Sequence, residues 1–68
     1  MSDTDWTPDR INDLRNERGQ TQTEFGLDLY ATTEGTAQKL VSDLERGEIQ
    51  PGGAVVRTLQ RMERGEEL

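Results

Sequence analysis

The side chains best suited to bind a ligand lie on one face of a predicted helix over residues 36–46. The apolar residues of this segment recur at i, i+3, i+4 and i+7, which forms one buried stripe: Ala37, Leu40, Val41 and Leu44. The opposite face carries amide, ammonium, hydroxyl, carboxylate and guanidinium groups: Gln38, Lys39, Ser42, Asp43 and Arg46. Such a face can make directed hydrogen bonds to a ligand, or it can simply be hydrated. The pattern itself leaves both interpretations open.

Catalytic chemistry has little support in the sequence. The chain has no histidine and no cysteine, so it lacks the usual general base and the imidazole and thiolate ligands of metal sites. Its acidic residues include no obvious pair held in a pocket. Its glycines match neither the GxxxxGK[ST] nor the GxGxxG phosphate-binding pattern. We therefore expect that the protein is not an enzyme and that it uses no metal ion and no cofactor.

Length and charge indicate one small acidic domain. The chain has 68 residues, 29% of them apolar, and a net charge of −6. Residues 1–7 and 62–68 carry five of the 14 acids and one of the eight bases, so the central part is nearly neutral. Long-range attraction to a polyanion should therefore be weak, although a local basic surface can still form. Seven arginines and a single lysine fit either a salt-adapted cytoplasm or a GC-rich genome.

Nothing in the sequence indicates a membrane or secretory destination. No apolar run approaches the roughly 20 residues that span a bilayer, and the amino terminus lacks the pattern of a signal peptide. We expect a cytoplasmic location.

Boundary residues mark the first two of four predicted helices. The residues TPD at positions 7–9 supply an N-cap, a first-turn proline and an acid, and Gly19 ends that helix. A capping box, TQTE at residues 21–24, opens the second helix. Residues 1–6 precede these signals and are assigned to a disordered or loosely packed N-terminal tail.

A connection rich in threonine and glycine, residues 31–35, precedes the third helix, whose expected N-cap is Thr36 and whose end is Gly47. The fourth helix presents apolar residues at helical spacing: Val55, Val56, Leu59 and Met62. No alternation typical of strands is found, so the predicted class is all-α. The domain should cover residues 7–64, followed by an acidic C-terminal tail over residues 65–68.

The order of these elements, together with two stretches, resembles a known family. RINDLRNERGQTQTEFG (residues 10–26) and TAQKLVSDLERGEIQP (residues 36–51) are similar to the helix-turn-helix family of phage repressors, Cro proteins and xenobiotic-response-element-type regulators. The most specific parts are TQTEFG and LERG-x-x-x-P. The resemblance implies a compact lambda-repressor-like domain of four or five helices. It also implies a transcriptional regulator, usually a repressor, that binds double-stranded operator DNA.

The resemblance also implies roles for particular side chains. The third helix of the family enters the major groove, and the positions that match its base-contacting residues are Gln38, Lys39, Ser42 and Asp43. Glutamine can pair with adenine, and lysine can donate to guanine. Candidate phosphate contacts lie at the opening of the second helix and around the third: Thr21, Gln22, Thr23, Thr33, Thr36 and Arg46. Arg46 could equally interact with the negative end of its own helix.

A further implied contact belongs to the scaffold. In lambdoid relatives, the positions that match Arg15 and Glu45 form a largely buried ion pair between the first helix and the end of the third. A bidentate arginine–carboxylate contact suits such a site. Two exposed charges without a mutual contact are the alternative.

The chain departs from the family in its connection and its length. The turn is usually three to four residues, whereas residues 31–35 number five. Either the second helix is longer, the third begins earlier at Thr33, or the connection is an ordered loop that meets the DNA backbone. Many relatives have a fifth helix. Without one, the fourth helix should leave apolar area that a twin subunit could cover, so we expect a homodimer.

The acidity of the chain is the third departure. Affinity for duplex DNA comes largely from neutralising phosphates, and Glu34 and Asp43 lie near the expected interface. This acidity favours an alternative function, a protein-interaction module of the antitoxin or antirepressor type on the same scaffold.

Overall fold

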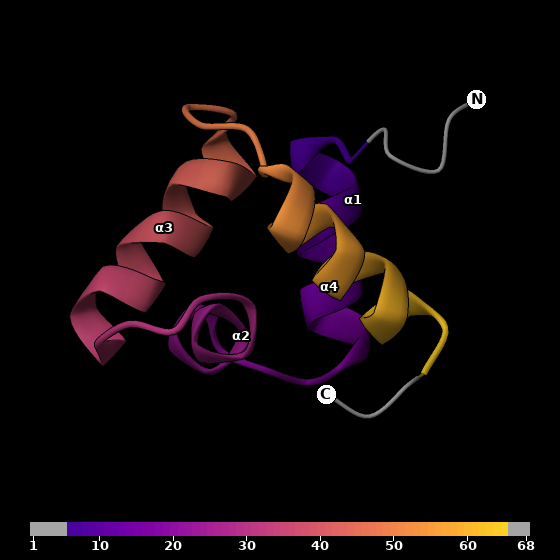
Figure 1. Ribbon diagram of the computed structural model, residues 1–68, viewed down its shortest axis with the longest axis horizontal. Helices are drawn as coiled ribbons and strands as arrows, with labels where there is room; N and C mark the ends of the chain where they lie inside the picture. Colours follow the sequence, from indigo (N-terminus) through magenta and orange to yellow (C-terminus); the bar gives the residue numbers. More distant parts are fainter. Residues whose placement is uncertain (1–5, 66–68) are drawn as a thin grey trace.

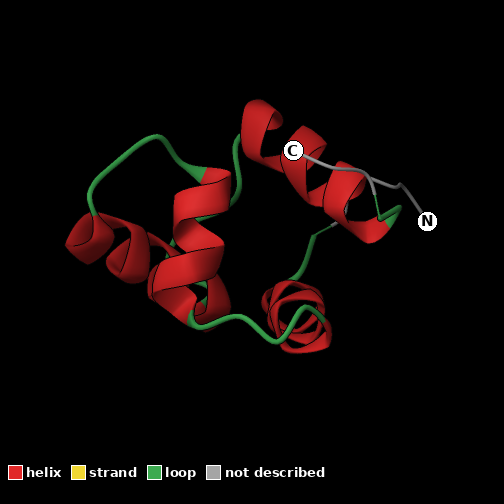
Figure 2. Ribbon diagram, turned by 90° about the horizontal axis from the view of Figure 1, so that it is seen from below, coloured by secondary structure: helices red, strands yellow, loops and turns green. Residues whose placement is uncertain are grey.

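The computed structural model describes residues 6–65, which form four helices joined by loops (Figures 1 and 2). In chain order they are α1 (Pro8–Glu17), α2 (Gln22–Leu29), α3 (Glu34–Arg46) and α4 (Gly53–Glu63). No strand occurs within residues 6–65, so the predicted all-α class is confirmed. Most of the two predicted tails, residues 1–5 and 66–68, lies outside the described residues.

The four helices enclose one apolar core. Figure 1 shows α2 end-on beside the start of α3, and α4 in front of α1. Seen from below, in Figure 2, the helices surround a central space that the core side chains fill. The core is made of residues from all four helices and one residue before α1: Trp6, Ile11, Leu14, Phe25, Leu29, Val41, Leu44, Val55, Val56, Leu59 and Met62.

A buried glycine permits the contact between α2 and α3. A Cβ atom at Gly26 would lie 2.5 Å from the carbonyl oxygen of Ala37 and 2.8 Å from its Cβ. No side chain fits there, so the backbone of α2 lies directly against the second turn of α3. This contact sets the position of α3 relative to the N-terminus of α2.

Short-range signals define most helix ends as expected. The hydroxyl of Thr21 accepts a hydrogen bond from the amide of Glu24 at 3.1 Å, and the carboxylate of Glu24 accepts one from the amide of Thr21 at 2.9 Å. The predicted capping box is therefore confirmed. Thr7 caps α1, as predicted. Gly19 and Gly47 follow α1 and α3 with φ of 66° and 75°, which lets the chain turn away.

The start of α3 differs from the prediction. Its N-cap is Thr33 and not Thr36, and its first helical residue is Glu34, whose carboxylate is favourable in a first turn. The link between α2 and α3 is thereby reduced to residues 30–33. The prediction of a five-residue connection over residues 31–35 was therefore wrong. The alternative, in which the third helix begins earlier at Thr33, describes this end of α3 better.

Trp6 belongs to the core, so its assignment to a loosely packed tail was wrong. Its side chain is buried, and the guanidinium carbon of Arg10 lies 3.9 Å from the centroid of the indole ring. Arg10 also forms an ion pair with Glu63 at 2.9 Å. Trp6 and Arg10 thus connect the segment before α1 to the end of α4, a link that no local sequence pattern predicts.

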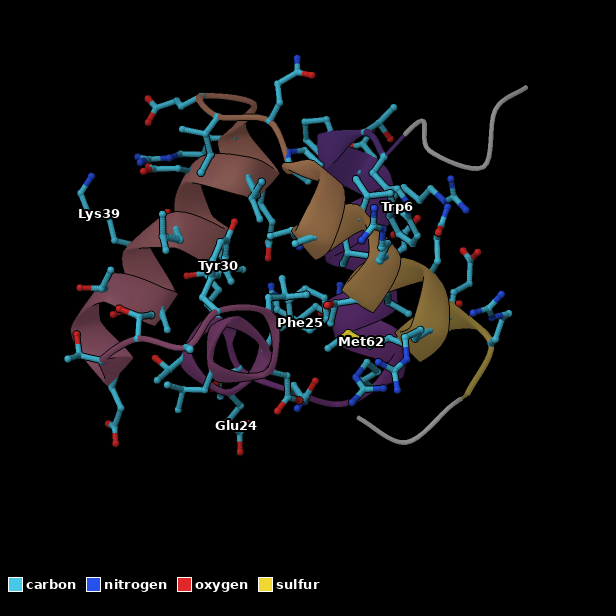
Figure 3. All side chains as sticks on the ribbon, in the orientation of Figure 1. Trp6, Glu24, Phe25, Tyr30, Lys39 and Met62 are labelled. Atoms are coloured by element: carbon cyan, nitrogen blue, oxygen red, sulfur yellow. The ribbon has the colours of Figure 1, made fainter. Side chains whose placement is uncertain are left out.

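The apolar face of α4 is covered within the chain. Val55, Val56 and Met62 are buried, and Figure 3 shows Met62 on the side of α4 that faces Phe25. Among residues 6–65, the exposed large apolar side chain is Leu27 on α2, at 42%. The expected homodimer therefore gains no apolar surface from α4 and stays a prediction.

Candidate functional site

The outer face of α3 projects away from the core. Gln38 and Lys39 are exposed, and the Lys39 side chain, 75% exposed, extends from the edge of the molecule in Figure 3. Thr36 is exposed one turn earlier, and Ser42 is half-buried one turn later. The face thus offers hydrogen-bond donors and acceptors along two turns of helix, and its first part, from Thr36 to Lys39, is the most exposed.

Asp43 has a different environment from the other four candidates on this face. Its side chain is only 10% exposed, and its carboxylate accepts from Arg46 Nη2 at 2.7 Å and from Lys39 Nζ at 3.4 Å. The hydrogen bond from Arg46, opposed by burial and aided by the charge of Lys39, holds the pKa of Asp43 below its usual value. Asp43 is therefore an ionised partner of two cations on its own helix, and its oxygens do not point freely to solvent.

Arg46 is exposed but shared between two carboxylates. Its side chain is 59% exposed, and the Nη2 atom that contacts Asp43 also lies 3.1 Å from Glu48. The hydrogen bond to Asp43 raises the pKa of Arg46. A phosphate that approached Arg46 would compete with two anions from the same chain.

An ion pair joins α1 to the end of α3, at the positions that the resemblance implies. Arg15 Nε donates to Glu45 at 2.8 Å, and Arg15 Nη2 donates at 3.2 Å, which makes the contact bidentate. Asn12 donates to the same carboxylate at 2.7 Å, and Arg15 also donates to the carbonyl of Gln20 at 3.1 Å. Burial raises the pKa of Glu45, but hydrogen bonds from Arg15 and Asn12 and the charge of Arg15 outweigh it, so that pKa lies below its usual value.

The candidates at the start of α2 lie beside this ion pair. Gln22 is half-buried, and a hydrogen bond from its side chain contributes to lowering the pKa of Glu45. The hydroxyl of Thr21 is used in the capping box, although its position is exposed, and Thr23 is half-buried. Gln22 thus lies near the carboxylate of Glu45 at the C-terminal end of α3.

The two threonines at the start of α3 lie together. Thr33 and Thr36 are exposed, and the Thr33 hydroxyl donates to the Thr36 hydroxyl at 3.1 Å. With Gln38 and Lys39, they place four exposed polar side chains on the first half of α3.

Sequence reasoning missed two features of this region. Asn12 completes the contacts of Glu45, but its sequence position carries no signal for that role. The sharing of Asp43 between Lys39 and Arg46 was detectable, because i,i+4 and i,i+3 spacing places opposite charges side by side on a helix. The burial of Asp43 was not detectable, because helical spacing places it on the polar side of α3.

A small cavity lies away from the outer face of α3. It has a volume of about 160 Å³ and is lined by apolar side chains from the segment before α1, from α1, from α3 and from the loop before α4: Trp6, Pro8, Ile11, Leu44, Ile49 and Pro51. No charged side chain lines it. It therefore offers no counter-charge for an anionic ligand.

Comparisons with known proteins give no family for this chain: no family model, no curated protein and no solved structure matches it.

None of the helices within residues 6–65, the longest of which has 13 residues, is long and apolar enough to cross a membrane.

Proposed function

We propose that the protein is a sequence-specific regulator of transcription that binds double-stranded operator DNA and acts as a repressor. The observation that carries the proposal is the exposure of Gln38 and Lys39 on the outer face of α3. An α-helix is about 10–12 Å across with its side chains, and the major groove is about 12 Å wide. A helix held by its apolar stripe, with amide and ammonium groups outward, has the size and the chemistry to bind there.

The proposed contacts divide between bases and phosphates. Gln38, Lys39 and Ser42 would reach base edges, since amide and ammonium groups can distinguish adenine and guanine in the major groove. Phosphate contacts would come from polar groups at the ends of the helices: Thr21, Gln22, Thr23, Thr33, Thr36 and Arg46. Binding would need no cofactor, and two copies would bind a palindromic site in the cytoplasm.

Fluorescence anisotropy with duplexes from the region upstream of the protein's own gene tests this proposal. Wild-type protein should bind one duplex more tightly than scrambled duplexes, and its affinity should fall with rising salt. Gln38→Ala should reduce discrimination at one base position by about tenfold, because a bidentate amide–adenine contact contributes about 1–3 kcal/mol. Gln22→Ala should weaken binding to all duplexes alike.

Gln50→Ala is the matched control, because Gln50 is an exposed glutamine in the loop between α3 and α4. It should leave both affinity and base preference unchanged. Gln22 touches the Glu45 network, so the thermal midpoint of Gln22→Ala must be compared with that of wild type. Absence of binding to every duplex at every salt concentration would refute the proposal.

A protein-interaction module of the antitoxin or antirepressor type is the second candidate function. It is favoured by the net charge of −6 and by the pairing of both α3 cations with Asp43 and Glu48. These pairs reduce the positive potential that a polyanion would meet. A stable complex with the product of a neighbouring gene, lost on Lys39→Glu and accompanied by no DNA binding, would support this function instead.

A further inference from the structure

One carboxylate holds both cations of the proposed DNA-binding face. Asp43 accepts from Arg46 at 2.7 Å and from Lys39 at 3.4 Å, while its own side chain is only 10% exposed. The two cationic side chains are 75% and 59% exposed, so they are accessible to an approaching anion. Asp43 itself is too covered to contact a base edge.

We propose that Asp43 is an internal competitor for DNA, which occupies Lys39 and Arg46 in the free protein and loses them to a base edge and to a phosphate when DNA binds. This inference rests on the proposed function and replaces the base-contacting role that the resemblance implies for Asp43. The carboxylate resembles a phosphate oxygen pair in charge and in hydrogen-bond acceptance. Binding then replaces one carboxylate by acceptor groups of the DNA at the same two cations.

The exchange has a consequence for the ions released. Each phosphate that the protein neutralises frees about 0.9 of a counterion from duplex DNA. When Lys39 turns to a base edge and Arg46 to a phosphate, the carboxylate of Asp43 loses both partners and takes up a cation from solution. One uptake offsets about one release, so the affinity of the wild-type protein falls less steeply with salt than its number of phosphate contacts requires.

The same exchange fits the acidic composition of the chain. A shallower salt dependence preserves more of the affinity as the salt concentration rises. The cost is a lower affinity in dilute buffer, where the competing carboxylate opposes binding most strongly. Asp43 would thus exchange affinity at low salt for tolerance of high salt.

Anisotropy titrations of Asp43→Asn over 50–500 mM salt, on the duplex that wild type prefers, test the inference. The variant should bind more tightly at low salt, and its slope of log affinity against log salt should be more negative by about 0.9. Between 50 and 200 mM this difference corresponds to an extra loss of about threefold. Asp13→Asn is the matched control, because it removes the same charge from an exposed position on α1 and should leave the slope unchanged.

A second measurement on the wild-type protein does not depend on the folding of the variant. The ¹³C resonance of the Asp43 carboxyl group should shift when the duplex is added, because its two cationic partners leave. An unchanged resonance would overturn the inference, and so would a slope of log affinity against log salt that is equal in Asp43→Asn and wild type. In either case, specific binding by the wild-type protein would leave the proposed function intact. If wild type binds no duplex at any salt, the proposed function fails, and the inference fails with it.

Discussion

The close contact between α2 and α3 predicts that Gly26→Ala destabilises the protein. The new Cβ would lie 2.5 Å from the Ala37 carbonyl oxygen, whereas ordinary van der Waals contact begins at 3.4 Å. The two helices would have to separate by about 1 Å, and such overpacking costs about 1–3 kcal/mol. The gain from replacing glycine within a helix, about 0.5–1 kcal/mol, offsets only part of this cost.

The expected net loss is about 1–2 kcal/mol in the free energy of unfolding. A chain of 68 residues has a total stability of about 3–10 kcal/mol, so this loss is a large fraction. At about 4–8 °C per kcal/mol, the thermal midpoint should fall by about 4–16 °C. Thermal and urea denaturation followed by circular dichroism at the helix band would measure both quantities.

Gly35→Ala is the matched control for this experiment. Gly35 lies in the first turn of α3, and a Cβ there would meet nothing within 4 Å. The same chemical change should therefore be neutral or stabilise the protein by up to about 1 kcal/mol. A Gly26→Ala variant as stable as wild type would refute the reasoning, and so would an equal loss at Gly35.

Two further predictions concern the contacts of α1. Glu45→Gln removes the counter-charge of Arg15, whose side chain is mostly covered. The free energy of unfolding should therefore fall by about 1–3 kcal/mol, a loss between those typical of exposed and of buried ion pairs. The pKa of Glu45 is lower in the folded than in the unfolded chain. The ionised carboxylate therefore stabilises the fold at pH values above the pKa of the unfolded chain, and this stabilisation is lost as the pH falls through the pKa of the folded chain. Urea denaturation between pH 7 and pH 2 should therefore show a steeper loss of stability in wild type than in Glu45→Gln, and parallel curves would contradict this. Trp6→Ala should cost about 3 kcal/mol through lost burial and lost contact with Arg10. Trp6→Phe should cost less, since the indole N–H has no hydrogen-bond partner among residues 6–65, and circular dichroism would distinguish the two variants.

Local sequence signals predicted where two of the four helices begin and where two of them end. The capping box at Thr21 and Glu24 and the glycines after α1 and α3 act through hydrogen bonds and backbone angles within a few residues. Such interactions need no partner from elsewhere in the chain. The start of α3 was misplaced because Thr33 and Thr36 carry the same N-cap signal at nearly the same place.

The candidate site was predictable in part for the same reason. Helical spacing places Gln38 and Lys39 opposite the apolar stripe of α3, and both are exposed. The same spacing also places Asp43 on the polar side, but its side chain is only 10% exposed in the structure and contacts its two cationic neighbours. Periodicity predicts the direction of a side chain around the helix axis, but it does not predict how much of that side chain the folded protein covers.

The sequence by itself determined the helical periodicity, the caps and the polar character of the outer face of α3, since these depend on neighbours within one or two turns. Only the tertiary structure decided that Trp6 enters the core, that the apolar side of α4 is covered, and that Gly26 lies against Ala37. The physical reason is that burial and close contact depend on which surfaces meet. Those surfaces belong to residues far apart in the chain, and no short pattern encodes their pairing.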